Sequence, residues 1–270
     1  MAALQRVVLD GVPALRLQHL ERAGGIVHGV FTREGGTSRG PWATLNVSAS
    51  VGDDPEHVRA NRARIAAALG FPPDAVVTTQ QVHGDRPVAA EEVERTGDAP
   101  EGDILAIGRP GWLLLMKFAD CVPLVLWDPR RGCGALAHAG WRGTALGVAA
   151  RAVRFLATRY GSNPDDILVG IGPAIGPCCY EVSDEVAAAV ERAVADVARD
   201  NGKPSPSLVL TRRGGPRPFL DLAEANRLQV VLAGVHPDHV ALAQICTACH
   251  ADRFFSHRAS GGRTGRFAVV

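Results

Sequence analysis

Three segments of the chain carry side chains that are good ligands for a borderline metal ion. They are QQVHGD with His83, ADCVP with Cys121, and AHAGWRG with His138. Each lies in a Gly- or Pro-rich loop at the end of a segment with strand character, and such strand ends can converge in space. Two imidazoles and one thiolate suit zinc, and three protein ligands leave a fourth position for water or substrate. These residue types therefore favour a catalytic zinc site.

Two other interpretations of the same residues remain open. The histidines can be hydrogen-bonded structural residues, with Cys121 a buried apolar thiol. Alternatively, Cys121 and His138 can act as nucleophile and base, since a thiolate beside an imidazole recurs in cysteine hydrolases. A bound zinc would consume that nucleophile, so metal content and sensitivity to alkylation separate the interpretations.

Two arginines stand where an anion could bind. Arg33 lies in FTREGGTSRG, where neighbouring glycines allow close approach and a guanidinium can grip phosphate oxygens in a fork. Arg142 lies in HAGWRG just before an expected helix, whose first turn can also meet an anion. The structural alternatives are a solvated turn for Arg33 and packing against Trp141 for Arg142. Phosphate is therefore a candidate ligand.

The bulk composition points to a small-molecule partner. The 270 residues are 46% hydrophobic, and 29 basic residues balance 28 acidic ones, for a net charge of +1. That balance gives no field that would gather nucleic acid or an anionic membrane. The first residues lack the pattern of a secretory signal, and no segment has the length of a membrane span, so we expect a cytoplasmic protein, either monomer or homodimer.

The six cysteines are expected to be reduced thiols. They are unevenly placed, and the adjacent Cys178 and Cys179 suit no small disulfide scaffold. Residues 246–250, CTACH, match the string that attaches c-type haem, but such a protein would need an export signal. We interpret that match as coincidence.

The pattern of elements predicts an α+β fold with mixed β-sheets flanked by helices, in a single compact domain over residues 1–270. Short strands open the chain, and Asp54, Pro55 and Gly70 frame a helix. Residues 104–138 alternate apolar runs and turns, as in a central sheet. Further helices are expected at 143–160, at 184–200 after a Ser183 cap, and at 221–235, with strands at 167–172 and 207–210 and a loop-rich C-terminus.

Several motifs together resemble the YfiH-type family from about Phe31 to the C-terminus. They are FTREGG, QQVHG, ADCVPLVLWDP, AHAGWRG, GIGPAIGPCCYEV, LDLAEANR, and CT followed by FFSHR and TGR, in that order. This family carries the names polyphenol oxidase, laccase-domain protein and purine nucleoside phosphorylase. The resemblance implies that His83, Cys121 and His138 hold zinc. It also implies phosphorolysis of adenosine, inosine and methylthioadenosine to base and ribose 1-phosphate, with adenosine deamination as a second activity.

The resemblance also suggests roles around the metal. Arg33 would hold phosphate or ribose, Asp120 would lie beside the metal and act with Cys121 and Arg33 in catalysis, and substrate contacts are expected from Asn46, Gln81 and Arg142. The chain departs from the family pattern at Lys117, Cys249 and His257, which puts contacts at the rim in doubt rather than the metal.

Two alternative activities attach to the same family. One is an amidase that edits peptidoglycan precursors. The other is a copper-dependent polyphenol oxidase, since Cu²⁺ can take the place of zinc on nitrogen and sulfur ligands. A multicopper centre needs about ten histidines, largely in H-x-H pairs. This chain has nine histidines and no H-x-H, so four-copper chemistry is not expected.

Overall fold

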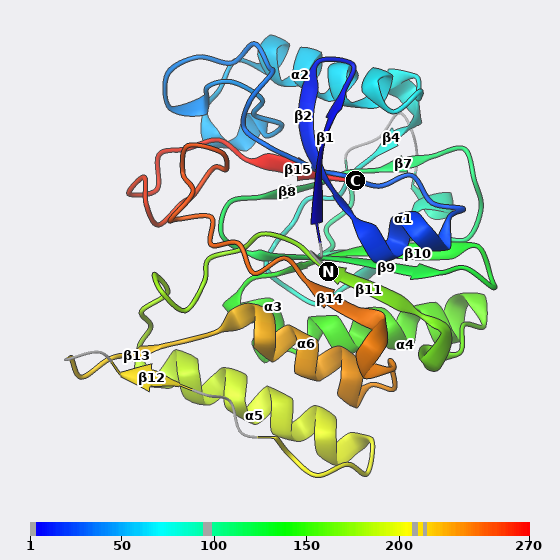
Figure 1. Ribbon diagram of the computed structural model, residues 1–270, viewed down its shortest axis with the longest axis vertical. Coiled ribbons are helices and arrows are strands. Elements are labelled where there is room, and N and C mark those ends of the chain that lie inside the picture. Colours follow the sequence, from blue (N-terminus) through cyan, green and yellow to red (C-terminus); the bar gives the residue numbers. More distant parts are fainter. Residues whose placement is uncertain (1–3, 94–98, 207–209, 213–214) are drawn as a thin grey trace.

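The first strands place alternate side chains on opposite faces of a buried sheet. Val12 and Ala14 face one core, and Leu15 and Leu17 face another, as the two-residue repeat of a strand requires. The computed structural model describes residues 4–93, 99–206, 210–212 and 215–270 (Figure 1). In it these strands join a five-stranded sheet in the order β1-β2-β3-β15-β8. Its strands are β1 (Leu4–Leu9), β2 (Val12–Leu17), β3 (Val30–Phe31), β8 (Met116–Phe118) and β15 (Phe267–Val269).

A second sheet of six strands has the order β14-β11-β9-β10-β6-β5. Its central strands β9 and β10 form an antiparallel hairpin in which every residue is buried, so both faces of this sheet must be covered. The strands are β5 (Pro87–Ala89), β6 (Ile104–Ile107), β9 (Val122–Asp128), β10 (Cys133–Ala139), β11 (Leu168–Ile171) and β14 (Val240–Leu242). Two short pairs join β4 (Val76–Val77) to β7 (Leu113–Leu114) and β12 (Thr211–Arg212) to β13 (Pro218–Phe219).

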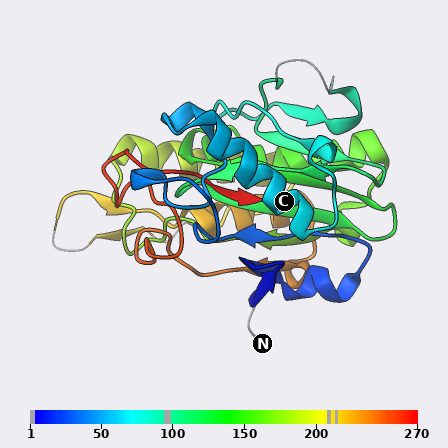
Figure 2. The same ribbon diagram turned by 90° about the horizontal axis from the view of Figure 1, so that it is seen from above.

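Helices cover the outer faces of the two stacked sheets. Seen from above, α2 (Pro55–Ala68) crosses over β15, and Ile65 belongs to the same core as Ala268 (Figure 2). On the other side, α3 (Trp141–Ala145), α4 (Val148–Tyr160) and α6 (Leu222–Leu232) cover the six-stranded sheet, and α5 (Asp184–Asp200) lies outside them (Figure 1). A short α1 (Gln18–Ala23) follows β2. The order of layers is therefore helix, sheet, sheet, helices, within one compact mixed α/β domain.

Most of the expected elements are confirmed. The side chain of Asp54 caps α2 by accepting the amide of Glu56, and Ser183 caps α5 by accepting the amide of Val186. The strand at 167–172 is present as β11, and residues 104–138 form strands as expected, but these divide between sheets: β6, β9 and β10 lie in the six-stranded sheet, β8 in the five-stranded sheet, and β7 beside β4. Among the described residues, no helix is long and apolar enough to cross a membrane.

One expectation was wrong in detail. The single helix expected at 143–160 is two helices, because Gly147 takes a left-handed conformation with φ +78° between α3 and α4 and leaves Leu146 exposed. The C-terminus is rich in loops, as expected, but β14 and β15 each join a sheet. Strands of three residues each are too short to show a two-residue repeat in the sequence. The strand expected at 207–210 lies largely outside the described residues.

Candidate metal centre

The hairpin of β9 and β10 brings the first two candidate ligands together. Cys121 immediately precedes β9, and His138 is near the end of β10. Because the two strands are antiparallel and His138 pairs with Pro123, the start of β9 and the end of β10 lie at the same edge of the sheet.

The neighbouring strands bring in the third ligand. β6 is antiparallel to β10, and Ala137 pairs with Ile104, so Asp103 lies beside His138. β5 is parallel to β6, which places the loop before β5 at this edge as well. His83 is in that loop. Three stretches of chain that are distant in sequence thus meet because of strand order and direction.

The ligand atoms of His83, Cys121 and His138 lie within 4.8 Å of one another. The two imidazole rings meet edge to face with their centroids 4.9 Å apart. Gly140 makes this approach possible, since a Cβ there would lie 2.9 Å from a ring carbon of His83 and 3.0 Å from the Cys121 sulfur. The donor set fits a zinc ion: two imidazoles and one thiolate, with room for a fourth ligand.

Asp103, which is fully buried, organises two of the three ligands. Its carboxylate accepts a 2.7 Å hydrogen bond from Nδ1 of His138. It also accepts hydrogen bonds of 2.8–3.1 Å from the backbone amides of Val82, His83 and Gly84. The first bond requires the His138 proton on Nδ1 and leaves Nε2 free to bind a metal. The other three fix the loop that carries His83.

The electrostatics of the three ligands also favour a bound cation. Burial acts to raise the pKa of the Cys121 thiol, but the two imidazoles outweigh it and lower the pKa to about 6. Burial acts to lower the pKa of His138, while Cys121 and Asp103 raise it to about 9. Burial acts to raise the pKa of Asp103, and its hydrogen bonds lower it below the usual value. Near neutral pH the metal-free site thus pairs the Cys121 thiolate and the Asp103 carboxylate with a His138 imidazolium, and a bound cation would replace the imidazolium proton.

Two residues at the site have backbone conformations that only glycine adopts readily. His83 has φ +62° and Asp120 has φ +85°. Such conformations cost about 1–3 kcal/mol each and persist where surrounding contacts fix them. The amide of His83 is held by Asp103, and Asp120 accepts the hydroxyl of Thr247 at 2.6 Å and the amide of Arg258 at 2.7 Å. These hydrogen bonds therefore hold His83 and Asp120 in conformations that would otherwise be unfavourable.

A cavity of about 940 Å³ opens over the three ligands. Its size suits a small organic substrate. Trp141, Tyr180, Ile175 and Leu222 give it apolar wall.

Basic side chains also line this cavity. Arg62 comes from α2, Lys117 from β8 and Arg266 from the residue before β15, and all three are partly buried. Burial and the charge of Arg62 lower the pKa of Lys117 to about 8. The Lys117 ammonium donates to the carbonyl of Thr79 at 2.7 Å, and no carboxylate neutralises it by direct contact among the described ion pairs. The cavity thus combines candidate metal ligands with a cluster of cations suited to phosphate.

Several expected site residues line the cavity. Asp120 does so beside Cys121, although both its carboxylate oxygens already accept hydrogen bonds. The amide of Gln81 pairs with the backbone of Lys117 at 2.8 and 2.9 Å and so positions that lysine. Arg142 lies in the cavity wall with its guanidinium carbon 4.4 Å from the ring centre of Trp141, so it packs against Trp141, and its contact with an anion stays a prediction.

Two residues that were expected to contact the substrate, Arg33 and Asn46, lie outside the cavity lining. Arg33 donates to the carbonyls of Ala43 and Ala251 at 2.9 and 2.7 Å and stacks over Phe255, outside the cavity lining. The sequence alone does not reveal that the carbonyls of Ala43 and Ala251 come close to Arg33 in the fold. Asn46 is fully buried and is not in the lining either. It bonds the backbone of Ser48 and accepts the amide of Arg266 at 2.8 Å, so it positions two residues that are in the lining.

The sequence did not single out Asp103, Arg62 or Arg266 as functional residues. Arg62 is part of a helix whose charges read as a solvated face, and Arg266 is one residue of a recognised TGR string. Asp103 follows Glu101 and Gly102 in an acidic turn of ordinary appearance. Only the pairing of β6 with β10 reveals that its carboxylate meets His138.

The fold is that of a known family. Residues 27–270 match the family described as multi-copper polyphenol oxidoreductase laccase, and the chain belongs to that family. It is 43% identical over 249 residues to the purine nucleoside phosphorylase YlmD of Geobacillus stearothermophilus, covering 90% of this chain and 88% of that protein. It is 40% identical to a purine nucleoside phosphorylase of Deinococcus radiodurans, covering 96% of this chain and 92% of that protein.

Solved structures agree with this assignment. The crystal structure of YlmD from Geobacillus stearothermophilus superposes with a TM-score of 0.87 at 39% identity, covering all of this chain and 98% of that one. A Bacillus licheniformis hypothetical protein, YfiH, gives a TM-score of 0.85 at 34% identity, again over all of this chain and 98% of that one. The expected resemblance and the expected fold class are therefore confirmed.

Proposed function

We propose that the chain is a zinc-dependent purine nucleoside phosphorylase that converts adenosine, inosine or methylthioadenosine and phosphate to the base and ribose 1-phosphate. One observation carries the proposal: a single cavity holds three candidate metal ligands together with Arg62, Lys117 and Arg266. The curated relatives named above carry the same activity in their names, which supports a phosphorylase over an amidase or a phenol oxidase. We take residues 1–270 as one catalytic domain.

The cations account for the phosphate. A phosphate oxygen must approach the anomeric carbon of the ribose, form the new C–O bond and displace the base, which leaves with the electrons of the C–N bond. Arg62, Lys117 and Arg266 can bind the phosphate and hold it in that orientation. This replaces the expected role of Arg33, whose guanidinium is bound to backbone carbonyls.

His83, Cys121 and His138 would hold the metal. When bound, a zinc ion would supply a Lewis acid that stabilises negative charge developing on the substrate. Asp103 holds a His138 proton on Nδ1, so Nε2 is the nitrogen that would bind the metal in place of its own proton. Zinc is our choice over copper because phosphorolysis needs no electron transfer, although copper could compete for the same ligands.

The remaining lining residues would bind and orient the nucleoside. Trp141 and Tyr180 offer aromatic surface for a purine, with Arg142 fixed over Trp141. Asp120 is held by Thr247 and Arg258 as an acceptor at the same wall. Adenosine deamination, in which water displaces the 6-amino group as ammonia, would use the same base-binding wall. The activity suits a cytoplasmic protein with access to nucleosides and phosphate.

The test is base release from inosine, adenosine and methylthioadenosine with and without phosphate, at known zinc content. We expect phosphate-dependent release of base and ribose 1-phosphate. Lys117→Met should raise the KM for phosphate, whereas Arg33→Met should leave it unchanged. A zinc-loaded protein that releases no base in the presence of phosphate would refute the proposal. Release of ammonia from adenosine without phosphate tests the deaminase activity separately.

A further inference from the structure

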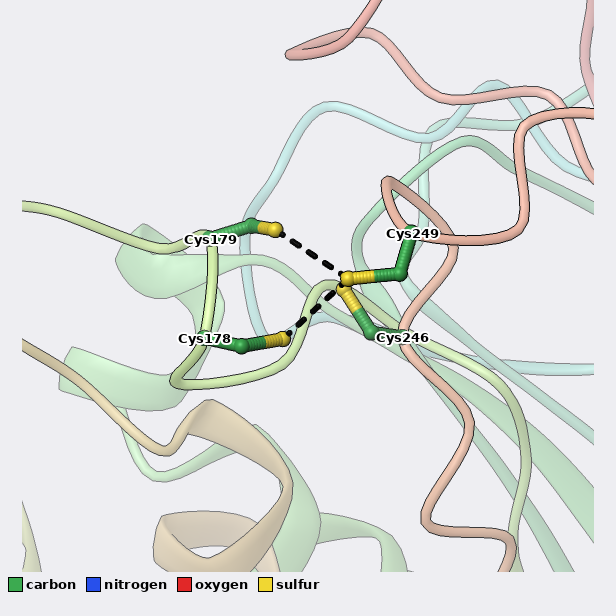
Figure 3. Close-up of side chains that lie close together, drawn as sticks. All are labelled: Cys178, Cys179, Cys246 and Cys249. Carbon is green, nitrogen blue, oxygen red and sulfur yellow. Dashed lines mark hydrogen bonds between the residues drawn. The ribbon is translucent and has the colours of Figure 1, made fainter.

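Four of the remaining cysteines converge outside the cavity. The sulfur atoms of Cys178, Cys179, Cys246 and Cys249, here called the four-cysteine cluster, lie within 4.8 Å of one another. Figure 3 shows Cys178 and Cys179 pointing from one loop towards Cys246 and Cys249 on another. All four are free thiols. Neither the adjacent pair nor the CTAC string was interpreted as half of a site in the sequence.

The fold brings these two loops together. β11 and β14 are parallel neighbours, so the loops that follow them leave the sheet at the same edge. Beyond the strands the two segments remain paired through an isolated β-bridge between Ala174 and Cys246. The amide of Thr247 also donates to the carbonyl of Ala174 at 3.0 Å. The positions of the four cysteines therefore follow from the sheet.

The local backbone is shaped around the sulfur atoms. The amide of Gly176 donates to the sulfur of Cys246 at 3.3 Å, which is an interaction that stabilises a thiolate. A Cβ on Gly176 would lie 3.3 Å from the Cys178 sulfur and 3.2 Å from the Cys246 Cβ, so a larger residue would crowd the cluster. The turn that follows, with the amides of Cys179 and Tyr180 both donating to the Gly176 carbonyl, directs both adjacent thiols to the same side.

The spacing fits one tetrahedral ion. Zinc–sulfur bonds of about 2.3 Å in a tetrahedron separate the sulfur atoms by about 3.8 Å. The Cys249 sulfur lies 3.5 Å from that of Cys178 and 3.4 Å from that of Cys179. An iron–sulfur cluster shares its cysteines among several iron atoms and would hold them further apart. A divalent cation at their centre would displace the thiol protons and balance the charge of the resulting thiolates.

We propose that the four-cysteine cluster binds a structural zinc ion, separate from the ion held by His83, Cys121 and His138. Four protein thiolates complete a tetrahedron and leave no open position, which is the arrangement of structural rather than catalytic zinc. Two ligands come from an adjacent Cys-Cys pair and two from a Cys-x-x-Cys loop. The proposal does not depend on the phosphorylase activity.

This zinc would clamp one wall of the cavity. Ile175 and Tyr180, on either side of the cysteine pair, both line the cavity. Thr247, next to Cys246, donates to the Asp120 carboxylate, and the Arg258 guanidinium donates to the carbonyl of Cys179 at 3.4 Å. Joining the two loops through a metal would fix Tyr180 relative to Asp120 without either residue touching the ion.

Zinc stoichiometry tests the proposal directly. Protein purified under a non-thiol reductant is dialysed against a weak chelator, and its zinc is measured by mass spectrometry. We expect two zinc ions in the original chain and one in His83→Ala/His138→Ala, which lacks the other site. Adding Cys249→Ser to that double variant should abolish the remaining ion. Cys133→Ser is the matched control, because Cys133 is outside both clusters and should keep two ions.

Cobalt substitution identifies the ligands without relying on the folding of a cysteine variant. Co²⁺ in the His83→Ala/His138→Ala protein should give the intense absorption of a tetrahedral tetrathiolate site, and alkylation of the four cysteines should be slow until a strong chelator is added. The proposal is overturned if this protein binds neither zinc nor cobalt after reduction, if Cys249→Ser retains the ion, or if the intact mass shows disulfides in place of metal. None of these measurements reads activity, so they remain informative if the phosphorylase proposal fails.

Discussion

Replacing Asp103 by Asn tests whether this carboxylate sets the metal affinity. The buried carboxylate accepts four hydrogen bonds through two oxygens, at 2.7–3.1 Å. An amide offers one acceptor oxygen, so with its NH₂ turned towards His138 it leaves the backbone amide of His83 without a partner, at about 1–3 kcal/mol. In addition, the amide NH₂ can satisfy His138 only as a donor to Nδ1. That arrangement moves the imidazole proton to Nε2, the nitrogen that must bind the metal.

From these changes we expect a 10- to 100-fold loss of zinc affinity at the site of His83, Cys121 and His138, or about 1.4–2.7 kcal/mol. The metal-free protein should also lose about 1–3 kcal/mol of unfolding free energy, the cost of the unpaired His83 amide. Zinc affinity is measured by competition with a coloured chelator in a Cys249→Ser background. This background removes the proposed ion of the four-cysteine cluster, so only the site of His83, Cys121 and His138 is measured. Asp85→Asn is the control, since Asp85 pairs with Arg151 only at 3.9 Å on the surface and should change stability by at most about 1 kcal/mol. If Asp103→Asn binds zinc as tightly as Asp85→Asn, the tautomer argument is wrong.

Three further predictions follow from single contacts. Gly140→Ala should lower zinc affinity at least as much as Asp103→Asn with little change in the circular dichroism spectrum, because its Cβ would lie within 3.0 Å of two ligands; unchanged zinc content would contradict the close approach. The KM for phosphate should rise as pH increases through 8, where Lys117 loses its charge, and Lys117→Met should show a high KM that is flat over that range. Burial lowers the pKa of His28 to about 4, and its Nε2 accepts the amide of Leu17 at 2.9 Å, so the unfolded state binds the proton more readily. Urea titrations should therefore show stability that is present above pH 6.5 and falls by about 3 kcal/mol towards pH 4, and His28→Gln should weaken this dependence.

The sequence predicts helix boundaries well where the boundary residue has a specific role in capping the backbone. Asp54 and Ser183 mark helix starts because their side chains replace missing backbone acceptors, and this chemistry is local. The break at Gly147 was not visible, since a glycine within a helical pattern can be tolerated or can take a left-handed conformation. Strands of three residues, such as β15, are stabilised by partners far along the chain and leave too short a pattern to detect.

Some residues of the candidate site could be predicted from the sequence, and others could not. His83, Cys121 and His138 were identified because imidazole and thiolate are unusual in Gly-rich loops, and the structure places them together. Asp103 and Lys117 were not assigned roles, because a carboxylate or an ammonium is common and only its neighbours give it a function. Arg33 was expected to bind phosphate, but its guanidinium donates to backbone carbonyls of distant segments, and the sequence around such an arginine looks the same as around one in a site.

The position of β15 has a consequence for how the protein is made. Residues 267–269 lie between β3 and β8, so the five-stranded sheet cannot close until residue 269 has been synthesised and has left the ribosome. His83, Cys121 and His138 emerge long before that, whereas Arg266 and the loop of Cys246 and Cys249 are synthesised later. A nascent chain could thus collect a metal ion on its early ligands while its cavity is still open, with two sheet edges exposed to other chains. Closure of the five-stranded sheet and completion of the cavity are then one late event, set by contacts between segments far apart in the sequence.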